Sequence, residues 1–227
     1  MVVIVFDVDG VLADSTLTYT ACVNYSLNRL GKQTLPAKTI LQTVNVRDIP
    51  GMLHSWGVDS SEREAFEKYL FSCTSQTIPP LVSQADNILS LLHKKGARLY
   101  VLSASKQQEV DSFLREHDIK KYFIDVYSEQ RNKSSVLKMI AKQERDKVYF
   151  IGDTVSDLLC AREARGASVD VCFIGVLHKQ LSGYVSRSMH WSAEEDLLKN
   201  MFGSENEKTI RSLSQVFSVI PEVRINK

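Results

Sequence analysis

The chain has 227 residues, of which 44% are hydrophobic and 24% are charged, a composition typical of a folded globular protein. Its 28 lysines and arginines nearly balance its 27 aspartates and glutamates, so it lacks the basic surplus of nucleic-acid-binding proteins, and we expect no nucleic acid partner. No apolar run approaches the roughly 18 residues of a membrane span, and the apolar start, Val2 to Phe6, is too short for a signal peptide. We therefore expect no membrane partner and a cytoplasmic location.

The cysteine pattern agrees with that location. The four cysteines form no CxxC pair and occur in apolar or helical contexts: Cys22, Cys73, Cys160 and Cys172. We therefore expect neither a disulfide framework nor a zinc site, which fits a reducing cytosol.

The first predicted element is a strand over residues 2–6, whose continuous β-branched and apolar residues indicate a buried central strand. The residues that follow, up to about residue 95, favour helices. A capping box, Ser61-x-x-Glu64, predicts the start of one of them, and the sequence IPPL at 78–81 predicts a hinge. The expected helical segments are 15–30, 36–44, 47–56, 61–71 and 83–95.

From residue 97 onward, strands and helices alternate. Predicted strands cover 97–105, 121–128, 147–153 and 169–176, and predicted helices cover 106–117, 133–145 and 157–165. This alternation is typical of βαβ units. We therefore expect an α/β fold: a Rossmann-like core (1–14 and 83–227) with helices on both faces of a parallel sheet, and an inserted all-helical cap (15–82). Beyond residue 177 the pattern weakens, although Ser192-x-x-Glu195 fits a helix start and residues 208–220 are amphipathic.

Polar residues follow the ends of these predicted strands. They are Asp7 and Asp9 with Gly10 after the first strand, Ser103 after the second, Lys133 after the third, and Asp153 and Asp157 after the fourth. Ligands of an open parallel sheet bind beyond the carboxyl ends of its strands, so we expect these residues to form one site.

The chemistry of this set indicates phosphoryl transfer. Several neighbouring carboxylates need a cation, and Mg²⁺ prefers carboxylate and phosphate oxygens. A carboxylate can attack phosphorus to give an aspartyl-phosphate, while Ser103 and Lys133 would hold phosphate oxygens. Gly10 would let the backbone turn sharply beside the phosphate. The expected ligand is a small phosphorylated metabolite.

The segments DVDGVLADS (7–15) and GDTVSD (152–157), with Ser103 and Lys133, resemble the four signature motifs of the haloacid-dehalogenase-like superfamily, over about residues 2–178. The resemblance implies an enzyme in which Asp7 is the nucleophile and Asp9 the general acid/base. It also implies that Mg²⁺ is held by Asp7, Asp9, Asp153 and Asp157. Asp157 would either bind the ion directly or hold a residue that binds it. The backbone amides of Val8 and Ala104 would help to bind the phosphate.

The resemblance extends to substrate class. An aspartate at position 9 implies a phosphatase or a phosphomutase rather than a dehalogenase. Arg47 resembles an arginine with which some sugar-phosphate mutases bind a second phosphate, although a solvated helix arginine fits equally well. Tyr19, His54 and Trp56 would line the cleft or pack the cap, and Asp14 and Ser15 would cap its first helix.

We predict a monomeric or homodimeric, magnesium-dependent phosphatase similar to phosphoglycolate phosphatases. Two alternatives stay open: a phosphomutase of the β-phosphoglucomutase type, and a non-catalytic phosphate-binding regulatory protein.

Overall fold

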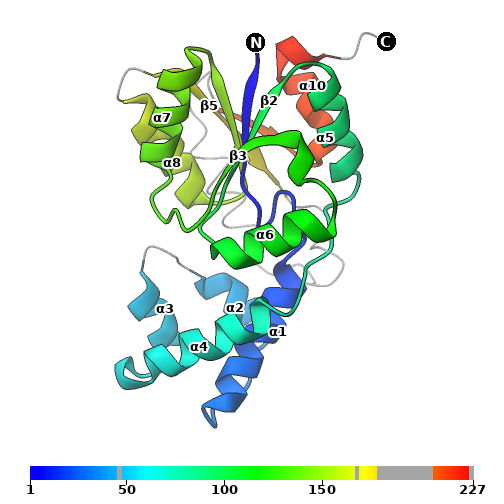
Figure 1. Cartoon of the computed structure of the whole chain (residues 1–227). Coiled ribbons are helices and arrows are strands. Elements are labelled where there is room, and N and C mark those ends of the chain that lie inside the picture. Colours follow the sequence, from blue (N-terminus) through cyan, green and yellow to red (C-terminus); the bar gives the residue numbers. More distant parts are fainter. Residues whose placement is uncertain (45–47, 167–168, 178–206, 225–227) are drawn as a thin grey trace.

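The computed structural model describes residues 1–44, 48–166, 169–177 and 207–224 (Figure 1). Two expectations lie outside these residues, namely the role of Arg47 and the helix start at Ser192. Within the described ranges, no helix is both long and apolar enough to cross a membrane.

Six parallel strands form one sheet with the order β3-β2-β1-β4-β5-β6. The strands are β1 (Val3–Phe6), β2 (Arg98–Leu102), β3 (Phe123–Tyr127), β4 (Val148–Gly152), β5 (Val171–Val176) and β6 (Glu207–Ile210). The strand order reverses direction at β1, which pairs with both β2 and β4. The carboxyl end of β1 is therefore where a ligand is expected to bind in such a sheet. The sequence analysis did not predict β6, which begins the amphipathic segment 208–220.

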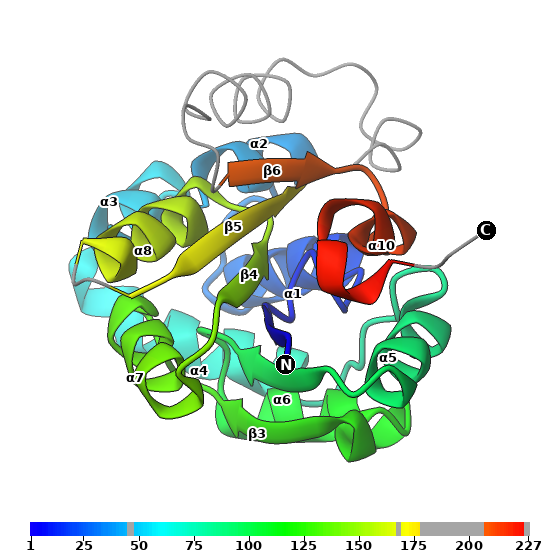
Figure 2. The ribbon, with the colours of Figure 1, turned by 90° about the horizontal axis from the view of Figure 1, so that it is seen from above.

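Helices cover both faces of the sheet, as the sequence predicted (Figure 2). Successive side chains of β1 point to opposite faces, and all four are fully buried, so each face needs its own apolar cover. One face packs against α5 (Ala85–Lys94), α6 (Gln107–Glu116) and the short α10 (Val216–Val219). The other packs against α7 (Ser134–Glu144) and α8 (Val155–Arg165).

Four further helices lie together beyond the carboxyl ends of the strands (Figure 1). They are α1 (Thr16–Arg29), α2 (Ala37–Thr43), α3 (Ile49–Ser55) and α4 (Arg63–Thr74), called the helical unit below. The unit has a hydrophobic core of its own, in which Trp56 packs against Phe66 with ring centroids 5.9 Å apart. Trp56 therefore packs the helical unit, whereas His54 is exposed on it. Short 3₁₀ turns cover Ser60–Glu62, Lys120–Tyr122, Leu213–Gln215 and Pro221–Val223.

Two details at the starts of these helices differ from expectation. Asp59 and Glu62, rather than Ser61 and Glu64, form the capping box, and α4 begins at Arg63. Lys32 lies 2.6 Å from the Glu62 carboxylate, a tertiary contact that favours the earlier pair. The Ser15 side chain also makes no capping hydrogen bond to α1 among the described residues.

The expectation that the cysteines form no disulfide is wrong for one pair. Cys22 of α1 and Cys73 of α4 are joined, with their Cα atoms 5.4 Å apart, whereas Cys160 and Cys172 are buried and free. The two partners are separated by 51 residues in the sequence, so only the packing of α1 against α4 brings them together. Because disulfides persist mainly in oxidising compartments, the cysteine argument for a reducing cytosol no longer holds.

Candidate active site

The loop after β1 brings backbone and side chains close together. Asp7 is buried, and the Val8 amide donates to its Oδ1 at 2.8 Å. Gly10 adopts a φ of +72°, and a Cβ at this position would lie 1.9 Å from Oδ2 of Asp153. Only glycine permits both this backbone conformation and this approach to the end of β4.

Three buried carboxylates meet at this point, from Asp7, Asp153 and Asp157. Their ligand atoms all lie within 4.8 Å of one another, a spacing that suits a metal ion. Asp7 follows β1, Asp153 follows β4, and Asp157 lies in the first turn of α8. The three residues are called the acidic cluster below.

Lys133 is buried against the acidic cluster. Its Nζ donates to Oδ2 of Asp7 at 2.6 Å and to Oδ1 of Asp157 at 2.8 Å. The second oxygen of Asp157 accepts from the Thr154 hydroxyl at 2.6 Å and from its amide at 3.2 Å. Both oxygens of Asp157 are therefore held by protein donors, so its geometry suits orienting Lys133 better than direct metal binding.

The charges in this site do not balance. Burial raises the pKa of the Asp7 carboxyl well above its usual value, Lys133 opposes this rise, and Asp157 and Asp153 add to it. Burial alone would lower the pKa of Lys133, but the carboxylates of Asp157 and Asp7 raise this pKa by more than burial lowers it, so the ammonium stays protonated. One ammonium cannot neutralise three carboxylates, and a bound cation would relieve the remaining repulsion.

Asp9 occupies a different environment from the acidic cluster. It is exposed, and the hydroxyl of Ser105 donates to its Oδ2 at 2.6 Å. Ser103 is fully buried, and its hydroxyl accepts from the Ser105 amide at 3.0 Å. The structure thus places Asp9 and Ser103 at the same edge as Asp7, with the half-buried Ala104 between the two serines.

The helical unit meets the core beside Asp9. The hydroxyl of Thr74, the last residue of α4, donates to the Glu109 carboxylate on α6. Burial raises the pKa of the Tyr19 phenol, and the negative charges of Asp9 and Glu109 raise it further, so this α1 side chain lies near both carboxylates. Tyr19 therefore lies beside the site rather than only within the core of the helical unit.

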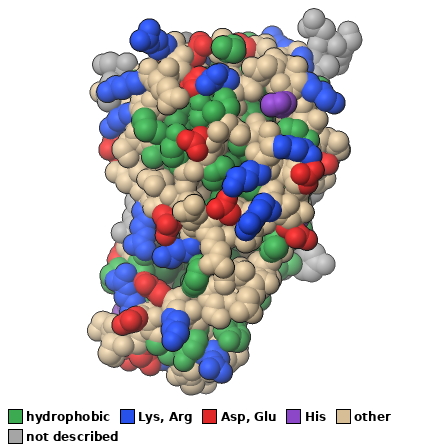
Figure 3. Space-filling view, in the orientation of Figure 1, with side chains coloured by type: hydrophobic (Ala, Val, Ile, Leu, Met, Phe, Trp, Pro, Cys, Tyr) green, Lys and Arg blue, Asp and Glu red, His purple; other side chains and the backbone are tan. Residues whose placement is uncertain are grey.

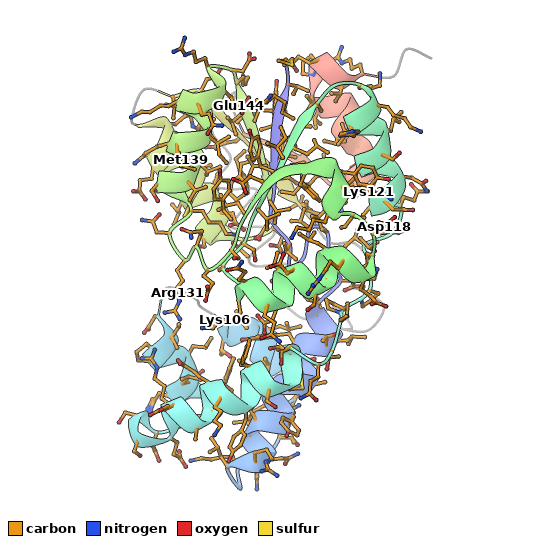
Figure 4. The ribbon with its side chains drawn as sticks, in the orientation of Figure 1. Lys106, Asp118, Lys121, Arg131, Met139 and Glu144 are labelled. Carbon is orange, nitrogen blue, oxygen red and sulfur yellow. A yellow bond between two sulfur atoms is a disulfide. The ribbon has the colours of Figure 1, made fainter. Side chains whose placement is uncertain are left out.

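Basic side chains also face the helical unit. Figure 4 shows Lys106 and Arg131 at the edge of the core that is turned toward it, and Figure 3 shows basic side chains at the same level of the surface. Lys106 pairs with Glu129 at 3.5 Å on the exposed surface.

The sequence analysis missed Ser105, Thr154, Glu109 and Thr74, whose hydrogen bonds organise the site. Ser105 and Thr154 each lie within two residues of a predicted site residue, so their nearness to the strand ends was a usable signal. The contact between Glu109 and Thr74 joins residues 35 apart and had no local signal.

Comparisons with known proteins assign the chain to a family. The profile of the haloacid dehalogenase-like hydrolases matches residues 4–171. A phosphoglycolate phosphatase of Pseudomonas fluorescens is 25% identical over 71% of this chain, and the match spans 65% of the length of that protein. A phosphoglycolate phosphatase of Vibrio parahaemolyticus is 24% identical over 75% of this chain and 83% of its own.

Solved structures share the fold. A predicted phosphatase from Clostridium acetobutylicum superposes with a TM-score of 0.74 at 19% identity, covering 97% of this chain and 98% of its own. A HAD-superfamily hydrolase of subfamily IA from Geobacter sulfurreducens gives a TM-score of 0.63 at 15% identity, covering 97% and 96%. The chain belongs to the haloacid dehalogenase-like hydrolases, and its sequence relatives are phosphatases.

Proposed function

We propose that this chain is a magnesium-dependent phosphatase that hydrolyses a small phosphomonoester through an aspartyl-phosphate on Asp7. The observation that carries the proposal is the buried ammonium of Lys133, held between Asp7 and Asp157 beside Asp153 at the carboxyl end of β1. A buried carboxylate next to a fixed cation suits attack on an anionic phosphate.

The donor set fits Mg²⁺. The acidic cluster offers hard carboxylate oxygens, and Asp7 and Asp153 are the members whose placement suits direct ligation. The backbone carbonyl of Asp9 would complete the protein ligands, as the family resemblance implies. When bound, the ion would neutralise phosphate charge near the nucleophile.

The reaction would proceed in two steps carried by two aspartates. A carboxylate oxygen of Asp7 forms a bond to phosphorus while the bond to the leaving alcohol breaks, and Asp9 gives that alcohol its proton. Water then attacks phosphorus, Asp9 takes the proton of the water, and phosphate leaves Asp7. Lys133 and Ser103, with the amides of Val8 and Ala104, would hold the phosphate oxygens throughout.

Residues 15–82 would act as the cap over a core made of 1–14 and 83–227. The peptide segments that connect the two run side by side, because the Asp14 amide donates to the Pro80 carbonyl at 2.9 Å. This pairing suits a hinge that lets substrate enter and then excludes water. Since relatives are phosphoglycolate phosphatases, 2-phosphoglycolate is the first substrate to test.

The test is phosphate release from a panel of phosphorylated metabolites and p-nitrophenyl phosphate, with and without Mg²⁺, beside Asp7→Asn. We expect release that requires Mg²⁺ and falls at least about 1,000-fold in Asp7→Asn. Release that is unchanged in that variant, or absent with every substrate, would contradict the proposal. Interconversion of sugar monophosphates would instead indicate a phosphomutase.

A further inference from the structure

The side chain of Asp9 is exposed, yet its carboxylate is tied to the core. The hydroxyl of Ser105 donates to Oδ2 of Asp9 at 2.6 Å across 96 residues of sequence. An exposed aspartate otherwise rotates freely about its side-chain bonds, so this hydrogen bond limits its orientations.

Ser105 is itself held by the loops that follow two neighbouring strands. Its amide donates to the Ser103 hydroxyl at 3.0 Å, after β2. Its carbonyl accepts from the Glu129 amide at 2.9 Å, after β3, and the Ser103 carbonyl accepts from the Gln130 amide at 2.9 Å. A serine whose backbone is held on both sides in this way can fix the direction of the carboxylate that its hydroxyl contacts.

Asp9 follows β1 at the carboxyl edge of the sheet, the edge beyond which the helical unit lies. The charge of Asp9 contributes to the raised pKa of Tyr19 on α1, which places the phenol near this carboxylate. The leaving group of a substrate bound at Asp7 would extend toward the same boundary between core and helical unit. Asp9 therefore lies where a proton donor for that leaving group is needed.

We propose that Ser105 is a positioning residue, which holds one carboxylate oxygen of Asp9 so that the other faces the leaving group of the substrate. This inference rests on the proposed function, because it assigns a partner to the acid/base residue. It concerns proton transfer and not phosphate binding, since Ser105 contacts Asp9 rather than Asp7 or Lys133.

The test compares two leaving groups in Ser105→Ala. Departure of an alkoxide from 2-phosphoglycolate, or from the aliphatic phosphomonoester turned over fastest, needs a proton, whereas p-nitrophenolate leaves as a stable anion without one. The ratio kcat/KM reports steps up to leaving-group departure. We expect kcat/KM to fall about 10- to 100-fold for the aliphatic ester and less than about threefold for p-nitrophenyl phosphate.

Two further variants separate positioning from folding. Ser105→Thr keeps the hydroxyl and should restore most of the activity toward the aliphatic ester. Ser214→Ala removes an exposed hydroxyl of the 3₁₀ turn after β6, whose partner is the Ser212 hydroxyl rather than a residue of the site, and should leave both substrates unaffected. Thermal unfolding of Ser105→Ala should match that of the wild-type protein.

Several outcomes would overturn the inference. An equal loss for both substrates, a rise in KM alone, or no loss at all would each assign Ser105 to another role. If wild-type protein hydrolyses the esters and Asp7→Asn does not, while Ser105→Ala behaves as wild type, the inference fails and the proposed function stands. If wild-type protein hydrolyses neither ester, both fail.

Discussion

At the scale of single residues, burial decides what each charged group in the site can do. Lys133 has basic neighbours in sequence, Arg131 and Lys138, yet it is buried and bonded to two carboxylates whereas Arg131 is exposed. Asp7 and Asp9 are two residues apart, yet one is buried in the acidic cluster and the other is exposed beside Ser105. Asp7 thus lies in a buried position and Asp9 in an exposed one, which suits the nucleophile and proton-transfer roles that we propose for them.

Replacing Lys133 by alanine leaves the acidic cluster without its ammonium. Because removing one partner from a buried ion pair strands the other, we expect the free energy of unfolding to fall by about 3–5 kcal/mol. Activity should fall at least about 100-fold, since a fixed cation near the phosphate is lost. Urea unfolding and phosphate release measure the two effects.

Lys138→Ala is the matched control. Lys138 lies on α7, the helix that Lys133 immediately precedes, and pairs with Glu163 at 3.8 Å on a partly exposed surface, so its removal should cost less than about 1 kcal/mol. Equal losses in the two variants would mean that the bonds of Lys133 to Asp7 and Asp157 do not stabilise the fold.

The raised pKa of the Glu109 carboxyl leads us to expect that the stability of the protein depends on pH. Burial raises its pKa above the usual 4.5, against hydrogen bonds from Thr74 and the Lys106 amide. Because the folded-state pKa is the higher one, the stability that Glu109 contributes is present below its usual pKa and is lost as pH rises through the raised value. The unfolding free energy of Glu109→Gln, relative to wild type, should therefore rise between about pH 4 and pH 7. Urea unfolding at both pH values tests this, and a constant or falling difference would contradict it.

At the scale of elements, the helical unit is fastened where it meets the core. The disulfide joins α1 to α4 at Cys22, about one turn after Tyr19, and at Cys73, next to Thr74. Thr74, which contacts Glu109, and the helix that carries Tyr19 are thus braced against each other. The disulfide closes a loop of 51 residues and so restricts the unfolded chain as well.

Removing this disulfide should destabilise the helical unit. The chain-entropy argument for a loop of this length gives about 4 kcal/mol, and we expect a reductant to lower the melting temperature accordingly. The double variant Cys22→Ser/Cys73→Ser should melt at the temperature of the reduced protein and should not respond to the reductant. Thiol titration of unreduced, denatured protein should find two free thiols, Cys160 and Cys172. Four free thiols would contradict the pairing.

At the scale of the whole molecule, residues 207–224 complete the core. Strand β6 pairs with β5, and the buried Glu207 accepts from Arg162 and Arg165 on α8 at 2.7–2.9 Å. The residues after β6 then return to the sheet, where Val216, Ile220 and Val223 are fully buried. The last described segment therefore belongs to the same hydrophobic core as β1.

Truncating Ile220 tests this role. Loss of a fully buried isoleucine leaves a cavity, so Ile220→Ala should lower the free energy of unfolding by about 2–5 kcal/mol. Ser218→Ala, an exposed neighbour on α10, should change it by less than about 1 kcal/mol. Urea unfolding compares the two variants, and a similar small change in both would show that this segment contributes little to the core.

Local sequence patterns determined the α/β fold, because each depends on residues only a few positions apart. The apolar run before Asp7 predicts a strand buried on both faces, and alternating strands and helices predict a parallel sheet. Since parallel strands present their carboxyl ends at one edge, the polar residues after them were predicted to meet there. The structure brings Asp7, Asp153, Asp157 and Lys133 together at that edge.

Only the tertiary structure decided how these residues are paired. The hydrogen bond from Lys133 to Asp7 joins positions 126 residues apart, and the one from Ser105 to Asp9 joins positions 96 residues apart. The disulfide joins two cysteines 51 residues apart. The sixth strand likewise exists because β5 offers an edge to pair with. Composition and periodicity carry no information about such contacts, because their geometry is set by how whole helices and strands pack. The sequence by itself determined where the candidate site lies, and packing determined that Asp7 is buried against the Lys133 ammonium while Asp9 stays exposed beside Ser105.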